Sequence, residues 1–296
     1  MKKIFNFEKR YFLLFILSAL FVSTIQQFPF FQGNSLHLLH SIKSFDLNKL
    51  KDDWIANQTN HLPLFTFINY FLIKIFSVNF LYLIHFILLL ICPFFLFLIC
   101  RYFYSNLNNL VSTLFWFSAF TVIYHESSLF GGVGGQDLIN EGYQPASFGV
   151  LFFVGIYFYL IKKNFLAIFF ICLSASIHPT YVLHSGFLIS GILVLYLIKR
   201  EYKLFAQILF LYSILILPIT IYILQNFFFI DQNLIIQGQK IMLSRIPHHA
   251  DINNWFSYKD ILSISLYLIS LLIIKNKIRI FIPILVFGFL SIILSV

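Results

Sequence analysis

Charged residues are scarce in this chain: Asp, Glu, Lys and Arg make up 10% of its 296 residues, against about 25% in soluble globular domains. Hydrophobic residues make up 60%, including 40 phenylalanines. So few charges cannot cover a water-exposed surface. Apolar runs close to the roughly 20 residues that cross a bilayer recur from near residue 11 almost to the last residue. We therefore expect an integral membrane protein.

Several functional motifs are also missing. The three cysteines, Cys92, Cys100 and Cys172, lie inside apolar runs without CxxC or Cys/His spacing, so neither a disulfide framework nor a zinc site is indicated. The glycines at 131–135 lack the lysine and hydroxyl of a phosphate-binding P-loop. The formal charge of +9 comes from short basic clusters between apolar runs, not from one basic surface, so we expect no nucleic-acid partner.

The apolar runs predict an all-α fold, a polytopic bundle of about nine transmembrane helices that forms one domain over residues 1–296. No run carries a charged residue in its interior. The runs cover about 11–28, 79–100, 107–124, 146–161, 165–178, 181–198, 204–225, 260–274 and 280–296.

Basic residues predict the topology. Counted from a cytoplasmic N-terminus, these runs place 13 of the 20 Lys and Arg residues on the cytoplasmic side, in the N-terminal segment and the short connections, as the positive-inside rule requires. The long loops, about 29–78, 125–145 and 226–259, are then non-cytoplasmic. The shorter segment 62–76 carries Thr66, Asn69, Tyr70 and Lys74 at helical spacing, which is typical of an amphipathic helix in the membrane interface.

The first two long loops hold candidate acids. Asp52 and Asp53, beside Trp54, form a carboxylate pair that could act as general base or hold a divalent cation; the alternative is a pair of turn acids. In the second loop, Asp137, Glu141 and Tyr143 follow the glycines, whose backbone amides can approach an anion. The alternative for this second loop is a structural hairpin.

Histidines provide the other candidates. His178 and Pro179 end a short helix near His184, and a histidine at that depth needs a polar partner or a wet cavity; the alternative is a plain helix end. The third loop presents Arg245, His248 and His249 close together. Arginine offers a forked donor to phosphate and histidines add proton-transfer groups, whereas the alternative is a solvated connection.

The layout resembles the C-type glycosyltransferases, integral membrane enzymes that take a sugar from a polyprenyl-phosphate carrier. The resemblance spans roughly residues 1–200. It rests on the first helix and long loop, the segment LPLFTFINYFLIKIF, a helix ending at Arg101, an acidic loop, the Lys162–Lys163 doublet and the His178–Pro179 pair.

That resemblance implies transfer of the sugar to a glycan or lipid acceptor, with a carboxylate as catalytic group and Arg245, His248, His249, His178, Glu141, Asp137 and Tyr143 binding substrate. Family members usually carry an acid soon after the first helix, where this chain has Gln26 and Gln27, so the catalytic role passes to Asp53 or Asp52. The chain also lacks further helices and a C-terminal domain, so we expect a truncated or divergent member. A non-catalytic lipid-binding or assembly protein and a transporter are the alternatives.

Overall fold

The structure is a computed structural model, and every secondary-structure element that it describes is helical, with no strand among the described residues. The chain divides into two compact units: residues 1–126 with 138–161, and residues 127–137 with 162–296. We describe each unit by itself. The described residues are 12, 15–16, 19–20, 36–44, 50–54, 56–104, 107, 110–126, 142–228, 231–245 and 258–295.

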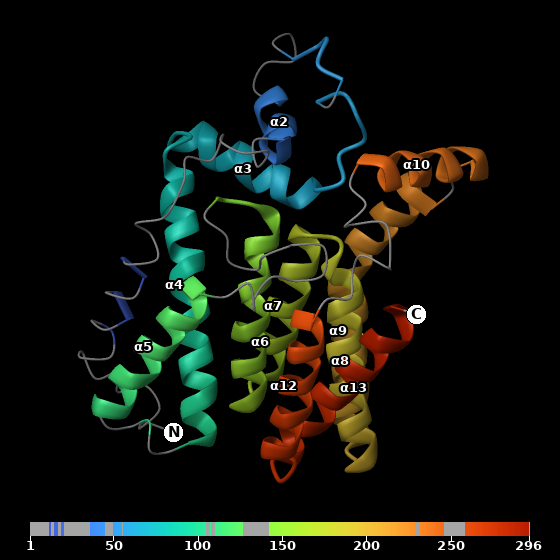
Figure 1. The fold of residues 1–296 in the computed structure, drawn as a ribbon. Coiled ribbons are helices and arrows are strands. Elements are labelled where there is room, and N and C mark those ends of the chain that lie inside the picture. The colour runs from blue at the N-terminus through green and yellow to red at the C-terminus, as the bar shows by residue number, and fades with distance from the viewer. Residues whose placement is uncertain are drawn as a thin grey trace. The chain divides into compact units, whose positions relative to one another are not determined.

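The first unit is organised around one long helix, α4, which contacts four other elements of the unit (Figure 1). Phe97 of α4 and Phe117 of α5 form a buried cluster with Phe15, from the first apolar run. Phe15 also packs on Phe94, with ring centroids 4.6 Å apart. The helices of this unit are α2 (Leu36–Lys43), α3 (Pro63–Ile75), α4 (Phe80–Phe103), α5 (Leu110–Glu126), the 3-10 helix η4 (Pro145–Val150) and α6 (Leu151–Leu160).

Helix α3 packs its polar side inward. Thr66 and Asn69 are buried, whereas Phe67 and Phe71 are 58% and 41% exposed. Ser41 of α2 donates its hydroxyl to the Thr66 carbonyl over 3.1 Å, which ties α2 to α3. The predicted helix is therefore confirmed, but part of its polar stripe faces protein, because the neighbouring elements supply hydrogen-bond partners there. The side of α3 that carries Phe67 and Phe71 faces outward.

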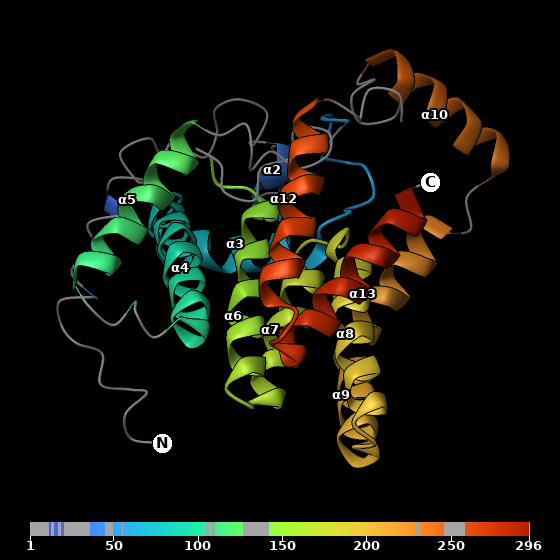
Figure 2. The same ribbon diagram turned by 60° about the horizontal axis from the view of Figure 1, so that its bottom comes forward.

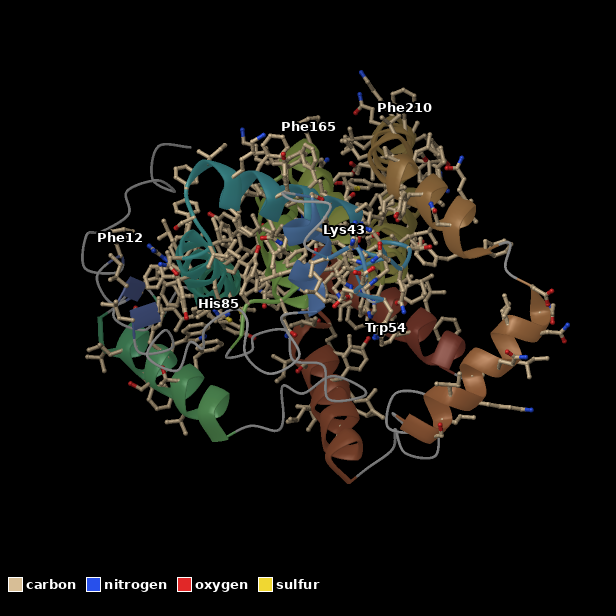
Figure 3. The ribbon with its side chains drawn as sticks, turned by 90° about the horizontal axis from the view of Figure 1, so that it is seen from above. Phe12, Lys43, Trp54, His85, Phe165 and Phe210 are labelled. Carbon is tan, nitrogen blue, oxygen red and sulfur yellow. The ribbon has the colours of Figure 1, made fainter. Side chains whose placement is uncertain are left out.

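The second unit is a bundle in which α8 contacts α7, α9 and α13 (Figure 2). Ser185 of α8 and Tyr212 of α9 share a hydrogen bond of 3.0 Å between their hydroxyls. Phe165 of α7 and Phe210 of α9 point outward, 62% and 69% exposed (Figure 3). Its helices are α7 (Asn164–Ile177), α8 (Tyr181–Ile198), α9 (Tyr202–Ile223), the π-helical turn η5 (Leu224–Phe228), α10 (Gln232–Arg245), α12 (Tyr258–Ile274) and α13 (Ile278–Ser295).

Basic residues lie just after the ends of two helices. Lys162 follows α6 and Arg200 follows α8, both with a left-handed backbone, at φ values of 64° and 58°. This conformation stops a helix, and it costs a non-glycine residue about 1–2 kcal/mol. A cation at a helix C-terminus offsets part of that cost through the helix dipole. Two of the basic clusters thus also act as helix stops.

In the part of the chain that the structure describes, three helices are long and apolar enough to cross a membrane: Phe80–Phe103, Tyr181–Ile198 and the continuous Tyr202–Phe228. The other apolar helices among the described residues have 10–17 residues. Eight of the nine apolar runs coincide with described helices to within about three residues, whereas most of 11–28 lies outside the described residues. The all-helical fold is confirmed, and the chain is membrane-associated; a bundle of nine spans stays a prediction.

We predict that Gly191→Ala lowers the stability of the second unit. A Cβ at residue 191 would lie 2.6 Å from the Pro283 backbone of α13, and backbone cannot move aside as a side chain can. We expect a loss of about 1–3 kcal/mol, the usual cost of overpacking. Gly186→Ala is the matched control, because its Cβ would meet only the Tyr212 hydroxyl, at 3.5 Å. Thermal unfolding of both variants in detergent measures the difference, and equal melting temperatures would contradict the close α8–α13 contact.

Candidate functional site

Asp52 and Asp53 lie on a folded turn, which we call the carboxylate turn (residues 50–54 and 56–57). The Ala56 N–H donates to Asp53 Oδ1 over 2.8 Å, so one carboxylate caps the turn. Asp52 is exposed, and Trp54 beside it is 67% exposed (Figure 3). The two acids therefore differ: Asp53 already has a structural task, and Asp52 faces outward.

Asn57 fixes the carboxylate turn from one side. Its Nδ2 donates to the carbonyls of Leu50, Lys51 and Asp53 over 2.9, 2.9 and 2.6 Å. Lys43 of α2 donates to Asn57 Oδ1 over 2.6 Å and to the Ala56 carbonyl over 3.3 Å. The turn is thereby tied to α2. These contacts give the pair of carboxylates a defined position although the turn contains no regular helix.

Tyr143 lies in a buried aromatic cluster of the first unit and is only 1% exposed. Its ring stacks on Phe65 of α3, with centroids 5.5 Å apart, and meets His85 of α4 edge-on at 6.3 Å. Its hydroxyl donates to Asn69 Oδ1 over 2.9 Å, across 74 residues of sequence. This contact gives Tyr143 a structural role, and its part in substrate binding stays a prediction.

The surroundings of Tyr143 keep its hydroxyl protonated. Burial raises its pKa well above the ordinary value of 10.0, and this outweighs the opposite effect of the Asn69 hydrogen bond. The hydroxyl is thus a permanent donor at physiological pH. Asn69 is fully buried, and its Nδ2 has no hydrogen-bond partner among the described residues. A buried amide group with an unsatisfied N–H lowers the free energy of unfolding, so the stability of the fold around Asn69 depends on the one hydrogen bond that its side chain makes with Tyr143.

His178 belongs to the second unit and forms a cluster with the start of α8. Its Nδ1 and the Thr180 hydroxyl share a short hydrogen bond. His184 Nδ1 donates to the Thr180 carbonyl over 3.2 Å, which in a neutral ring leaves Nε2 as the acceptor. The Tyr181 ring lies between the two histidines, with centroid distances of 4.9 and 5.8 Å. Two oriented imidazoles at one helix start can bind an anion or move a proton.

The remaining predicted site residues lie outside the part of the chain that the structure describes. These are Asp137, Glu141, His248 and His249, together with the side chain of Arg245. Among the described residues, no group of three or more His, Cys, Asp or Glu could hold a metal ion. The described site residues are therefore Asp52 and Asp53 on the carboxylate turn and Tyr143 in its aromatic cluster, in the first unit, and His178 in the second unit.

The sequence reasoning missed Asn57 and Asn69. Asn57 begins an Asn-Gln-Thr triplet, a pattern that draws attention to glycosylation, but its Nδ2 is engaged with backbone carbonyls. Asn69 stood out only as one polar position in an apolar helix. A buried asparagine in such a helix needs a partner, and that requirement was the one available signal.

Comparison with family models, with curated proteins and with solved structures found no match.

We predict that Tyr143→Phe destabilises the first unit by about 1–3 kcal/mol, because it leaves the Asn69 amide buried without its one hydrogen bond. The double variant Asn69→Leu with Tyr143→Phe should recover much of that loss, since two apolar partners leave nothing unsatisfied. Tyr70→Phe, at a less buried tyrosine of α3, is the control. Unfolding in mixed micelles compares these three variants and the single variant Asn69→Leu with the wild type, and additive losses in the double variant would contradict a direct bond.

We also predict that acid loosens the packing of α2 on α3. Burial is the main cause that lowers the pKa of His40 and of His61 below 6.5, and for His40 the positive charges of His61 and Lys43 add to it. The unfolded segment therefore takes up protons more readily than the folded one. Stability is complete above pH 6.5 and falls as the pH drops toward the lowered values.

Hydrogen exchange of the α2 amides, corrected for the intrinsic pH dependence, measures this effect. We expect faster opening at mildly acidic pH in the wild type. His61→Gln should weaken the pH dependence, because it removes one titrating ring and its charge on His40. The same opening free energy in acid and at neutral pH would show that these histidines do not control the packing.

Proposed function

We propose that the protein is a membrane-embedded glycosyltransferase that takes a sugar from a polyprenyl-phosphate donor on the non-cytoplasmic side. In this proposal the N-terminus is cytoplasmic, about nine helices span the membrane, and the loops at 29–78, 125–145 and 226–259 lie on the reaction side. The acceptor is a glycan or a lipid hydroxyl. The basic clusters and the family resemblance support this arrangement.

One observation carries the proposal: an exposed carboxylate, Asp52, beside an exposed aromatic ring, Trp54, on a turn that is held in place. Asn57 and Lys43 hold this turn through their hydrogen bonds. A positioned carboxylate is what general-base catalysis requires. The indole supplies a flat apolar face with one N–H donor next to it.

In the proposed reaction Asp52 and Asp53 have different roles. Asp52 accepts the proton of the acceptor hydroxyl, whose oxygen forms the new bond to the anomeric carbon of the sugar as the bond to the carrier phosphate breaks. Asp53 holds the turn through its bond to Ala56 and positions Asp52. The departing phosphate gains negative charge, and cationic groups stabilise it.

The phosphate-binding part of the proposal rests on Arg245, His248, His249 and His178, with Glu141, Asp137 and Tyr143 as further contacts. Arg245 can hold two phosphate oxygens with its planar fork, and a histidine can donate a proton. The ordered pair His178 and His184 supports a role for histidines in the second unit. Assays with and without a chelator test whether the Asp52–Asp53 pair holds a divalent cation.

The test uses the full chain in lipid nanodiscs with polyprenyl-phosphate sugars of several types, and mass spectrometry detects the released polyprenyl phosphate. We expect Asp52→Asn to abolish release while the melting temperature stays unchanged, because an exposed side chain contributes little stability. Asp53→Asn keeps an acceptor for the Ala56 N–H and should retain part of the activity, whereas Asp53→Ala should lose it. Each variant is assayed with and without a chelator.

Glu201→Gln, at another exposed acid, is the matched control and should release carrier like the wild type. Wild-type release that survives in Asp52→Asn would assign the carboxylate turn a purely structural task. Donor binding without release in every protein would favour the non-catalytic lipid-binding protein. Passage of the donor across the bilayer without cleavage would favour a transporter.

A further inference from the structure

Helix α10 has two chemically different sides. Leu234, Gly238 and Ile241 recur at the spacing that places residues on one side of a helix, with Ile235 beside them. The other side carries the polar residues Asn233, Gln237, Lys240 and Ser244 at the same spacing. Gln232 and Gln239 lie outside that polar side, so the amphipathic pattern is incomplete, and nothing in the loop composition predicted it.

The apolar side of α10 is uncovered. Of its described side chains, all but Gly238 are exposed, and its five described large aliphatic residues are 40–59% exposed. A Cβ built at Gly238, in the middle of that side, would meet no atom within 4 Å. Five exposed aliphatic side chains on one short helix call for an apolar environment.

The composition of α10 excludes a membrane span. Seven of its 14 residues are polar or charged, whereas a span needs a predominantly apolar run. It also follows closely after Tyr202–Phe228, a helix that is long and apolar enough to cross a membrane. Only three residues separate the two helices, so α10 begins close to the membrane surface.

We propose that α10 lies in the membrane interface of an anionic bilayer, with Leu234, Ile235 and Ile241 among the acyl chains. Lys240 then faces lipid phosphates, and a long basic side chain reaches a headgroup layer readily. The one acid at this helix, Asp231, sits at its N-terminal start, where its Oδ1 accepts the Asn233 N–H over 2.7 Å. It therefore lies away from the basic end, which keeps that end positive.

A lipid surface fits α10 better than a protein groove would. Apolar residues are not confined to that side: Ile236 and Leu243 lie roughly 140–180° around the helix axis from Leu234 and Ile241, and a glycine lies between the last two. A lipid surface adapts to such an irregular profile. The inference depends on membrane association alone and is independent of sugar transfer.

The test places one environment-sensitive fluorophore at a time on the full chain, in a background in which Cys92, Cys100 and Cys172 are replaced by Ala. Leu234→Cys and Ile241→Cys label the apolar side, and Gln237→Cys and Ser244→Cys label the polar side. The protein is reconstituted in vesicles of phosphatidylcholine with phosphatidylglycerol. Nitroxide groups on the acyl chains quench from the lipid, and iodide quenches from water.

We expect nitroxide lipid to quench at residues 234 and 241, and iodide to quench at 237 and 244. Adding Gly238→Leu should increase nitroxide quenching at 241, because the new side chain has room and completes the apolar side. Gln237→Leu adds a leucine on the polar side and is the matched control, without that increase. Lys240→Glu should lower nitroxide quenching at 241 only when phosphatidylglycerol is present.

Two results would overturn the proposal. Iodide quenching of equal strength at all four positions would make α10 a water-exposed helix. Shielding of residues 234 and 241 from both quenchers would mean that protein covers this side, from the same chain or from a second copy. Both results are independent of the transferase assay.

Discussion

The backbone hydrogen bond is the constraint on which the rest of this structure depends. A chain with so few charged residues has hydrocarbon as its main solvent, and hydrocarbon offers no partner to a free N–H or carbonyl. Helices satisfy these groups internally, so secondary structure follows from composition. Lipid then provides no strong force that brings one helix to another. Close backbone contacts such as Gly191 with Pro283, and a few side-chain hydrogen bonds, decide which helices pack together.

The positions of the helices were predictable for this reason. The run at 181–198 is α8 residue for residue, and the run at 79–100 differs from α4 by one residue at its start and three at its end. Pairing between helices was not predictable. The Tyr143–Asn69 bond joins a connecting segment to a helix 74 residues earlier, and no local pattern encodes such a distance. For the same reason the sequence did not show that Thr66 and Asn69 of α3 face protein, because polar residues at helical spacing can face either protein or water.

The candidate site shows a similar division. The sequence pointed to Asp52 and Asp53 but could not separate them, since the two residues are identical and adjacent. The difference arises from folding: one carboxylate accepts a backbone N–H and the other is exposed. Asn57, whose amide holds the turn, stands in a pattern that is typical of glycosylation and does not indicate this role. In a short turn, the residue that orients a functional group is harder to recognise from the sequence than the residue that carries the group.

The contact between α8 and α13 also sets an order of events during synthesis. Gly191 is made roughly 90 residues before Pro283, and at about 5–20 residues per second this is a delay of roughly 5 to 20 seconds. Throughout that interval α8 is in the growing chain, but the helix that covers its glycine does not yet exist. In the growing chain α8 therefore has a vacant, closely fitting side until α13 has been made. Protection of α8 from other apolar segments matters most at this stage, and the arrival of α13 ends that exposure.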